Sequence, residues 1–197
     1  TLPMEEAFSQ HLKEEELELP AGQFALFMNS MYAVDAYVRD YFRKAALDAL
    51  LAKKLPVTVF GEGWEKYSCG DGHSLRREPA VPFALSFERI AKAHVLLNVS
   101  PIFNRGMHDR VSAGMANHAV VLTDENPYLR RTFTGGKELL FYSLEKPDTL
   151  CEQAERALTD VRLREKIAAS AYETFEREYT WKRRAEQILA FAEEVEA

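Results

Sequence analysis

The stretch Val57-Thr-Val-Phe-Gly-Glu-Gly-Trp64 decides the fold, because a short β-branched and apolar run that ends in glycine is typical of a strand entering a tight turn. Three later runs share its apolar character, at residues 94–99, 119–123 and 138–143. None of them alternates between apolar and polar residues, which is the pattern of strands covered by helices on both faces. We therefore expect all four strands to lie in an open parallel sheet.

The segments around these strands are predicted to be helices. Residues 31–51 place apolar side chains at three- and four-residue steps, with charged residues between them. Shorter helices are expected at about residues 86–92, 109–116 and 127–133. A helical cap follows in three pieces, from Pro147, over residues 160–178, and after Thr180 as N-cap. The last piece carries an apolar stripe, formed by Trp181, Ile188, Leu189 and Phe191. Strands alternating with helices through right-handed crossovers predict a Rossmann-like, three-layer α/β domain.

Three segments are less regular. Residues 24–27 are too few to show a period, so they fit either a short strand or an early helical turn, and we favour the strand. Residues 68–82 contain two glycines and two prolines and are predicted to be irregular. Residues 1–22 are interpreted as an acidic lead-in or linker, which leaves residues 23–197 as the domain.

Composition narrows the classes of partner. The chain has 197 residues, of which 47% are hydrophobic, enough to bury a core. Its formal net charge of -6 argues against a general affinity for nucleic acid or anionic membranes. The apolar runs are too short to cross a bilayer. Cys69 and Cys151 lie far apart without metal-ligand spacing, so we expect neither a disulfide nor a zinc site, and we predict a reducing cytoplasm.

The segment Asn98-Val-Ser-Pro-Ile-Phe-Asn-Arg-Gly-Met-His-Asp-Arg110 joins a predicted strand to a predicted helix. Polar, glycine-containing loops in this position bind phosphate through backbone N–H groups. Asp109 is the expected N-cap, Gly106 lets the backbone approach a ligand, and either Arg105 or Arg110 can neutralise a diphosphate. The same residues also fit an ordinary connecting loop, in which Asp109 only caps, the arginines are solvated and His108 is a surface residue.

The loop Gly61-Glu-Gly-Trp64 ends another strand, so Gly61 and Gly63 are expected at the same edge of the sheet. It has neither the dinucleotide fingerprint nor a P-loop lysine, which argues against NAD and ATP. The sequence also lacks a Gly-x-Ser-x-Gly elbow and a His-Glu-x-x-His motif. We therefore assign no catalytic residue and expect no metal and no cofactor.

Taken together, four motifs resemble the group 1 glycosyltransferases of the spore-maturation CgeB-like branch. They are Val57-x-x-Phe-Gly-x-Gly-Trp64, Leu96-Leu-Asn-Val-Ser-Pro101, Gly106-x-His-Asp-Arg110 and Ala119-Val-Val-Leu-Thr-Asp124. The resemblance continues to Tyr179-Thr-Trp181 at the start of the last helix. It implies the C-terminal half of a GT-B fold, in which a nucleotide-diphosphate sugar lies across the strand ends and faces a second, acceptor-binding domain. The residues that the resemblance places around the donor are Gly61, Gly63, Ser100, Gly106, His108, Asp109 and Arg110. We add Arg105, because its positive charge could neutralise the diphosphate.

The resemblance is incomplete at the nucleotide. Related transferases carry a ribose-binding glutamate where this chain has Ala113, and an earlier glutamate where it has Arg105. Asn117-His118 stands where the family often has Cys-Gly. We expect the donor-binding domain of a glycosyltransferase, whose N-terminal, acceptor-binding domain is missing from this chain and without which it is expected to be inactive. The alternative is a degenerate, non-catalytic interaction module; a sugar-nucleotide epimerase ranks last, because no additional acid or base pair stands out.

Overall fold

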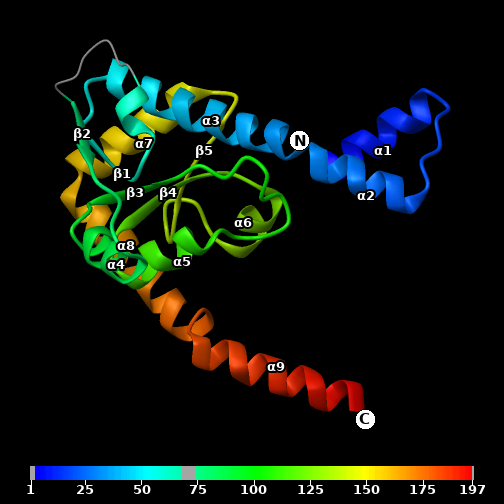
Figure 1. Cartoon of the computed structure of the whole chain (residues 1–197). Coiled ribbons are helices and arrows are strands. Elements are labelled where there is room, and N and C mark those ends of the chain that lie inside the picture. Colours follow the sequence, from blue (N-terminus) through cyan, green and yellow to red (C-terminus); the bar gives the residue numbers. More distant parts are fainter. Residues whose placement is uncertain (1–2, 68–73, 197) are drawn as a thin grey trace.

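The computed structural model describes residues 3–67 and 74–196 and has parallel strands between layers of helices (Figure 1). The strands are β1 (Val57–Phe60), β2 (Leu75–Glu78), β3 (Val95–Asn98), β4 (Val120–Asp124) and β5 (Leu140–Tyr142). β1 pairs with β2, and β3, β4 and β5 pair in that order, all of them parallel. The four predicted strands are confirmed, but the sheet is divided in two, between β1 and β3.

The structure has one strand more than the four predicted, namely β2. It lies where we predicted an irregular segment, so that part of the prediction is wrong. Its sequence, Leu75-Arg-Arg-Glu, contains a single apolar residue, so it has no hydrophobic run to find. Only Leu75 is buried, and the strand is held at the edge by its parallel pairing with β1. The two glycines of the predicted irregular segment fall in residues 68–73, outside the described residues.

The helices that surround the sheets follow the predicted order. The long helix α3 (Tyr32–Ala52) precedes β1, and the 3₁₀ turn η1 (Trp64–Lys66) follows it. The helices between and after the later strands are α4 (Phe83–Ala91), α5 (Asp109–Ala116), α6 (Pro127–Thr132), α7 (Pro147–Thr159), α8 (Val161–Glu178) and α9 (Trp181–Glu196). All of the predicted helices are present, and no predicted end is shifted by more than three residues; α5 has the predicted ends, and the shift is largest at α4.

Core side chains cover both faces of the three-stranded sheet, as the apolar strands predicted. All five residues of β4 are buried. Val120 and Leu122 belong to the cluster that includes α3 and α7, whereas Val121 belongs to the cluster that includes α5 and α6. Helix α5 lies very close to the sheet at Gly114, where an added Cβ would be 2.4 Å from Cγ2 of Val121.

The N-terminal region forms two helices, α1 (Met4–Glu14) and α2 (Ala21–Ser30), which lie beside the start of α3 and away from the sheets (Figure 1). Residues 24–27 are part of α2, so the predicted strand there is wrong. Pro20 at the N-cap position starts this helix, and the Ala- and Leu-containing sequence continues it. Phe8 of α1 stacks on Phe27 of α2 with ring centroids 4.1 Å apart. The boundary predicted between residues 22 and 23 falls inside α2.

Helix α9 projects away from the domain and does not cap it (Figure 1). Thr180 is its N-cap as predicted, since the hydroxyl accepts a hydrogen bond from the Arg183 amide at 3.3 Å. Its apolar stripe is exposed, however: Trp181 is 90% exposed and Phe191 67%. The predicted helical cap is therefore correct for α7 and α8 and wrong for α9, because periodicity identifies an apolar face without saying what covers it.

Within the described ranges, the helices are all too short or too polar to cross a membrane.

Candidate functional site

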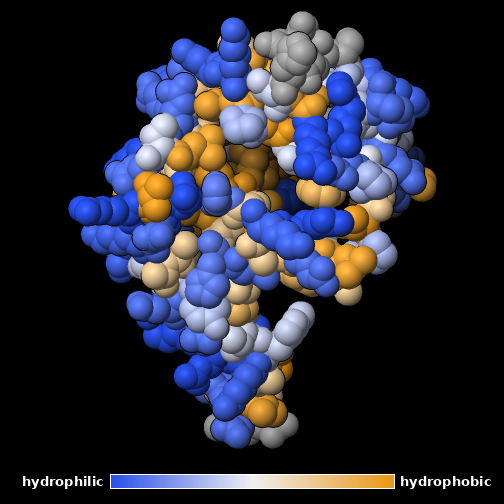
Figure 2. Space-filling view, turned by 90° about the vertical axis from the view of Figure 1, so that its left-hand side faces the viewer, coloured by the Kyte–Doolittle hydropathy of each residue, from blue (hydrophilic) through white to orange (hydrophobic). Residues whose placement is uncertain are grey.

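A large cleft of about 1700 Å³ lies between β1 and β3, at the division between the two sheets. Helices α3, α4 and α5 also contribute to its walls. Figure 2 shows the hollow, with hydrophobic residues inside it and hydrophilic residues around its rim. The order is β1-β2 in one sheet and β3-β4-β5 in the other, so the chain starts each sheet at a strand that borders the cleft. Parallel α/β sheets bind ligands in the crevice where the strand order reverses.

A buried polar network lies at the carboxyl ends of β3 and β4. Asn98 donates from Nδ2 to Oγ1 of Thr123 at 3.0 Å, and its Oδ1 accepts from the Ser100 hydroxyl at 3.1 Å. The Ser100 amide donates to Oδ1 of Asp124 at 2.7 Å. The Tyr142 hydroxyl donates to the backbone oxygen of Asn98 at 3.0 Å. These bonds fix the end of β3 against β4 and β5.

Arg110 extends from α5 into this network. Its Nη1 donates to Oδ1 of Asn98 at 2.7 Å, and the residue also lines the cleft. Burial lowers the pKa of Arg110, with a further lowering by the charge of Arg43. Burial also raises the pKa of Asp124 to about 6, although the Ser100 amide and Arg110 act in the opposite direction. Arg110 is therefore a partly buried cation held by a neutral amide, with other N–H groups left for a ligand.

His108 is the N-cap of α5, because its Nδ1 accepts a hydrogen bond from the Arg110 amide at 3.1 Å. We predicted Asp109 in that role, and this prediction is wrong by one residue. Asp109 is the first helical residue, with its carboxylate 2.5 Å from the same Nδ1. The cap needs Nδ1 without a proton, whereas the Asp109 contact needs Nδ1 with one. Burial, followed by the charge of Arg110, lowers the pKa of His108 and favours the neutral, capping ring.

The predicted donor residues are brought only partly together. Three of them line the cleft: His108, Asp109 and Arg110. Ser100 lies in the buried network behind them. Gly61 and Gly63 follow β1 in left-handed conformations, with φ of 119° and 88°, which favour glycine. Their chain neighbours Phe60 and Trp64 line the cleft.

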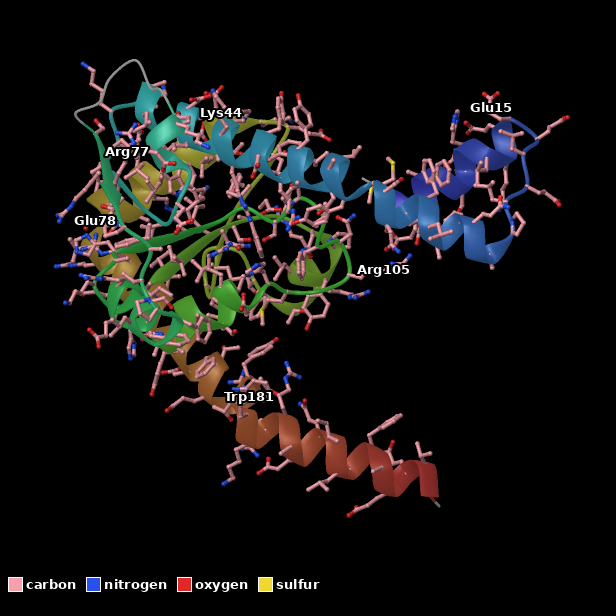
Figure 3. All side chains as sticks on the ribbon, in the orientation of Figure 1. Glu15, Lys44, Arg77, Glu78, Arg105 and Trp181 are labelled. Atoms are coloured by element: carbon pink, nitrogen blue, oxygen red, sulfur yellow. The ribbon has the colours of Figure 1, made fainter. Side chains whose placement is uncertain are left out.

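The other two predicted residues lie outside the cleft lining. Arg105 points away from the sheets at the outer edge of its loop (Figure 3) and pairs with Glu6 of α1. The Gly106 carbonyl accepts a hydrogen bond from Nδ2 of Asn126 at 3.2 Å, which fixes the loop that contains this glycine. Arg105 is thus placed to join the N-terminal helix to the loop, and not to meet a ligand in the cleft.

Several polar residues of the site escaped the sequence prediction. Asn98 and Asp124 could have been found, since each is a polar residue at the end of an otherwise apolar strand. Tyr142 and Arg43 gave no such signal: Tyr142 lies in an apolar run, and Arg43 fits the polar side of an amphipathic helix. Arg43 nevertheless lines the cleft, and so does Ala113, which presents only a methyl group.

No group of three or more His, Cys, Asp or Glu residues that could hold a metal ion is found within residues 3–67 and 74–196. Beside its apolar walls, the cleft offers a ligand the buried guanidinium of Arg110 and the imidazole of His108, whose lowered pKa favours the neutral ring. Such a set of groups suits an anionic group attached to a larger, partly apolar molecule.

The fold is found in solved structures of other proteins. Two structures of Anabaena Alr3699/HepE match this chain at 12% identity, one in complex with UDP-glucose (TM-score 0.62) and one with UDP and glucose (TM-score 0.63). Each match covers 76% of this chain and 44% of HepE, so the chain spans less than half of that protein. The C-terminal domain of LpcC, a group 1 glycosyl transferase from Francisella tularensis, also matches, at 12% identity and a TM-score of 0.44, over 68% of this chain and 92% of that one.

Among curated proteins, none matches this sequence. The sequence model of a family described as glycosyl transferase-like matches residues 39–190, which begin within α3, include both sheets and end within α9. This match covers well over half of the chain, and it agrees with the fold. The chain belongs to the glycosyl transferase-like family.

Proposed function

We propose that the cleft binds a nucleotide-diphosphate sugar, and that the chain is the donor-binding domain of a glycosyltransferase. One observation carries the proposal. Arg110 is fixed by Asn98 at the carboxyl end of β3 and stands on the wall of the cleft between the two sheets. A guanidinium held there suits a diphosphate, because its planar N–H donors match phosphate oxygens.

In the proposed reaction, an acceptor hydroxyl attacks the anomeric carbon of the sugar. The bond from that carbon to the diphosphate oxygen breaks, and the nucleotide diphosphate leaves with the bonding electrons. Arg110 stabilises the negative charge that develops on the leaving group, and no metal is used. The hydroxyl proton passes to a base that we do not assign within this chain. We propose that a second, acceptor-binding domain supplies the acceptor; the CgeB-like branch and the cytoplasmic location stay predictions.

A non-catalytic interaction module is the second candidate, and Ala113 favours it. This residue lines the cleft where related transferases have a ribose-binding glutamate, and a methyl group cannot accept a hydrogen bond from a ribose hydroxyl. A module of this kind keeps the fold but no longer binds the donor. It predicts that no nucleotide binds at millimolar concentration.

Thermal unfolding with UDP, GDP, ADP and CMP at millimolar concentration separates the two functions. A nucleotide present at about a hundred times its Kd adds about 2.7 kcal/mol of stability. We expect one nucleotide to raise Tm and Arg110→Ala to remove the shift. Arg162→Ala is the matched control, because it removes an exposed arginine of α8. An unchanged Tm with all four nucleotides would favour the non-catalytic module.

A further inference from the structure

Arg43 of α3 stands on the wall of the same cleft as Arg110, and so do Arg76, Arg89 and Arg184. Arg43 precedes the buried residues Ala46, Leu47 and Leu50 by three, four and seven positions, so it lies on the face of α3 that packs toward the core. Its side chain is 39% exposed. Arg43 therefore contributes a partly exposed guanidinium to the cleft wall from α3, whereas Arg110 contributes one from α5.

The positive charge of Arg43 is weakly compensated. Its nearest acidic partner is Asp40, with Nη1 and Oδ1 3.7 Å apart, which is too long for a hydrogen bond. The Asp40 carboxylate is 78% exposed and is screened by water. Arg43 is therefore held near the cleft by its place on α3 and not by a strong ion pair.

Arg43 also acts electrostatically on the residues across the cleft. After burial, its charge is the largest cause that lowers the pKa of Arg110. It lowers the pKa of His108 as well, after burial and Arg110. Two carboxylates oppose it there: Asp109, whose side chain is 76% exposed, and Asp124, which accepts the Ser100 amide. Cationic groups from α3 and α5 thus converge on one part of the cleft, at a cost that a bound anion would remove.

We propose that Arg43 and Arg110 hold the diphosphate of the donor between them, one guanidinium from α3 and the other from α5. This inference rests on the proposed function and adds a binding residue to it. Each guanidinium can donate two parallel hydrogen bonds to a phosphate group. Because α3 belongs to the part of the chain before β1, the donor site then includes a helix on which no donor-binding residue was predicted.

Calorimetric titration tests the role of Arg43. UDP, GDP and ADP are titrated into the wild-type chain, Arg43→Ala and Lys44→Ala, and so are uridine, guanosine and adenosine. We expect Arg43→Ala to raise the Kd of the nucleoside diphosphate that binds the wild type by about tenfold, which is the effect of losing one charge-assisted hydrogen bond. Binding of the matching nucleoside is unchanged. Lys44→Ala is the control, because it removes the same charge from the next residue of α3, where Lys44 pairs with Asp48 outside the cleft lining (Figure 3).

The outcomes separate this inference from the proposed function. Suppose that the wild type binds a nucleoside diphosphate and that Arg110→Ala weakens this binding. If Arg43→Ala then leaves the binding unchanged, the inference is wrong and the proposed function stands. If the wild type binds none of the nucleotides, both are wrong. A ligand-free measurement adds a second test: Arg43→Ala should raise the pKa of His108 in an NMR titration, and an unchanged pKa would show that Arg43 does not act on the cleft.

Discussion

Nη1 of Arg110 donates a hydrogen bond of 2.7 Å to Oδ1 of Asn98. The orientation of the Asn98 amide follows from its other contact, because Nδ2 donates to Oγ1 of Thr123 and Oδ1 is left to face Arg110. Asn98 itself is 1% exposed. The core of the sheet thus positions the guanidinium before any ligand arrives, which reduces the entropy lost on binding.

Replacing Asn98 by leucine tests this relationship. We expect Asn98→Leu to lower the free energy of unfolding by about 1–3 kcal/mol, because Ser100, Arg110 and Thr123 each lose a buried hydrogen-bond partner. Nucleotide binding should weaken as well, since Arg110 is no longer held. Urea unfolding and calorimetric titration give the two values. Lower stability with an unchanged Kd would mean that Arg110 does not depend on Asn98 for binding.

Asp124 gives the stability of the chain a pH dependence. Burial raises its pKa to about 6, above the ordinary value of 3.8. A raised pKa means that the folded chain holds the proton more tightly, so the stabilisation is complete below about pH 4 and is lost as the pH rises to about 7. We expect the wild type to lose up to about 3 kcal/mol relative to Asp124→Asn over this range. Urea unfolding at several pH values measures the difference, and parallel curves for the two chains would contradict the assignment.

Gly114 allows α5 to pack against β3 and β4. In Gly114→Ala the new Cβ would lie 2.4 Å from Cγ2 of Val121 and 2.9 Å from Cδ2 of Leu96. We expect this overpacking to lower the free energy of unfolding by about 1–3 kcal/mol. The loss would occur although alanine is usually more favourable than glycine in a helix. Gly22→Ala is the control, because Gly22 lies in α2 and has nothing within 4 Å of an added Cβ. Thermal unfolding should show Gly114→Ala alone as destabilised; equal Tm values would contradict the close packing.

The apolar stripe of α9 contributes little to the stability of the domain. Ile188 and Phe191 are 68% and 67% exposed. We expect Ile188→Glu and Phe191→Glu each to change the free energy of unfolding by about 0.5 kcal/mol or less. Ile167→Ala in α8 is the comparison, since Ile167 is fully buried and its truncation should cost about 2–5 kcal/mol. A large loss for Phe191→Glu, measured by urea unfolding, would mean that α9 packs on the domain.

The strands β3, β4 and β5 were predicted because helices cover both faces of their sheet. β1 was predicted from its β-branched and apolar residues and the glycines that follow, although Thr58 and Phe60 are exposed. Residues such as Val120, Val121 and Leu122 are apolar because helices cover them on each side, and this leaves a continuous run to find. β2 has one buried residue and left no run. The strand predicted at residues 24–27 failed for a related reason, because a short apolar segment looks the same in an exposed helix.

The site was predictable only where it is local in sequence. The loop from Ser100 to Arg110 was found because strand, glycine and helix start follow one another. Tyr142 bonds the backbone of Asn98, 44 positions away, and Arg105 pairs with Glu6, 99 positions away. Such contacts depend on tertiary packing, which periodicity does not encode. His108 and Asp109 are both able to cap, and the sequence could not choose between neighbours.

Nucleotide-induced chemical-shift changes in the ¹⁵N-labelled chain test the central claim most directly. UDP, GDP, ADP and CMP are added in turn, and the backbone amides that respond are located. A donor site in the cleft predicts that one nucleotide shifts the amides of Ser100, Asp109 and Arg110 together with those of β1 and its glycine loop. It also predicts that Arg110→Ala removes the response. Changes confined to other parts of the chain, or no change with any of the four, would contradict it.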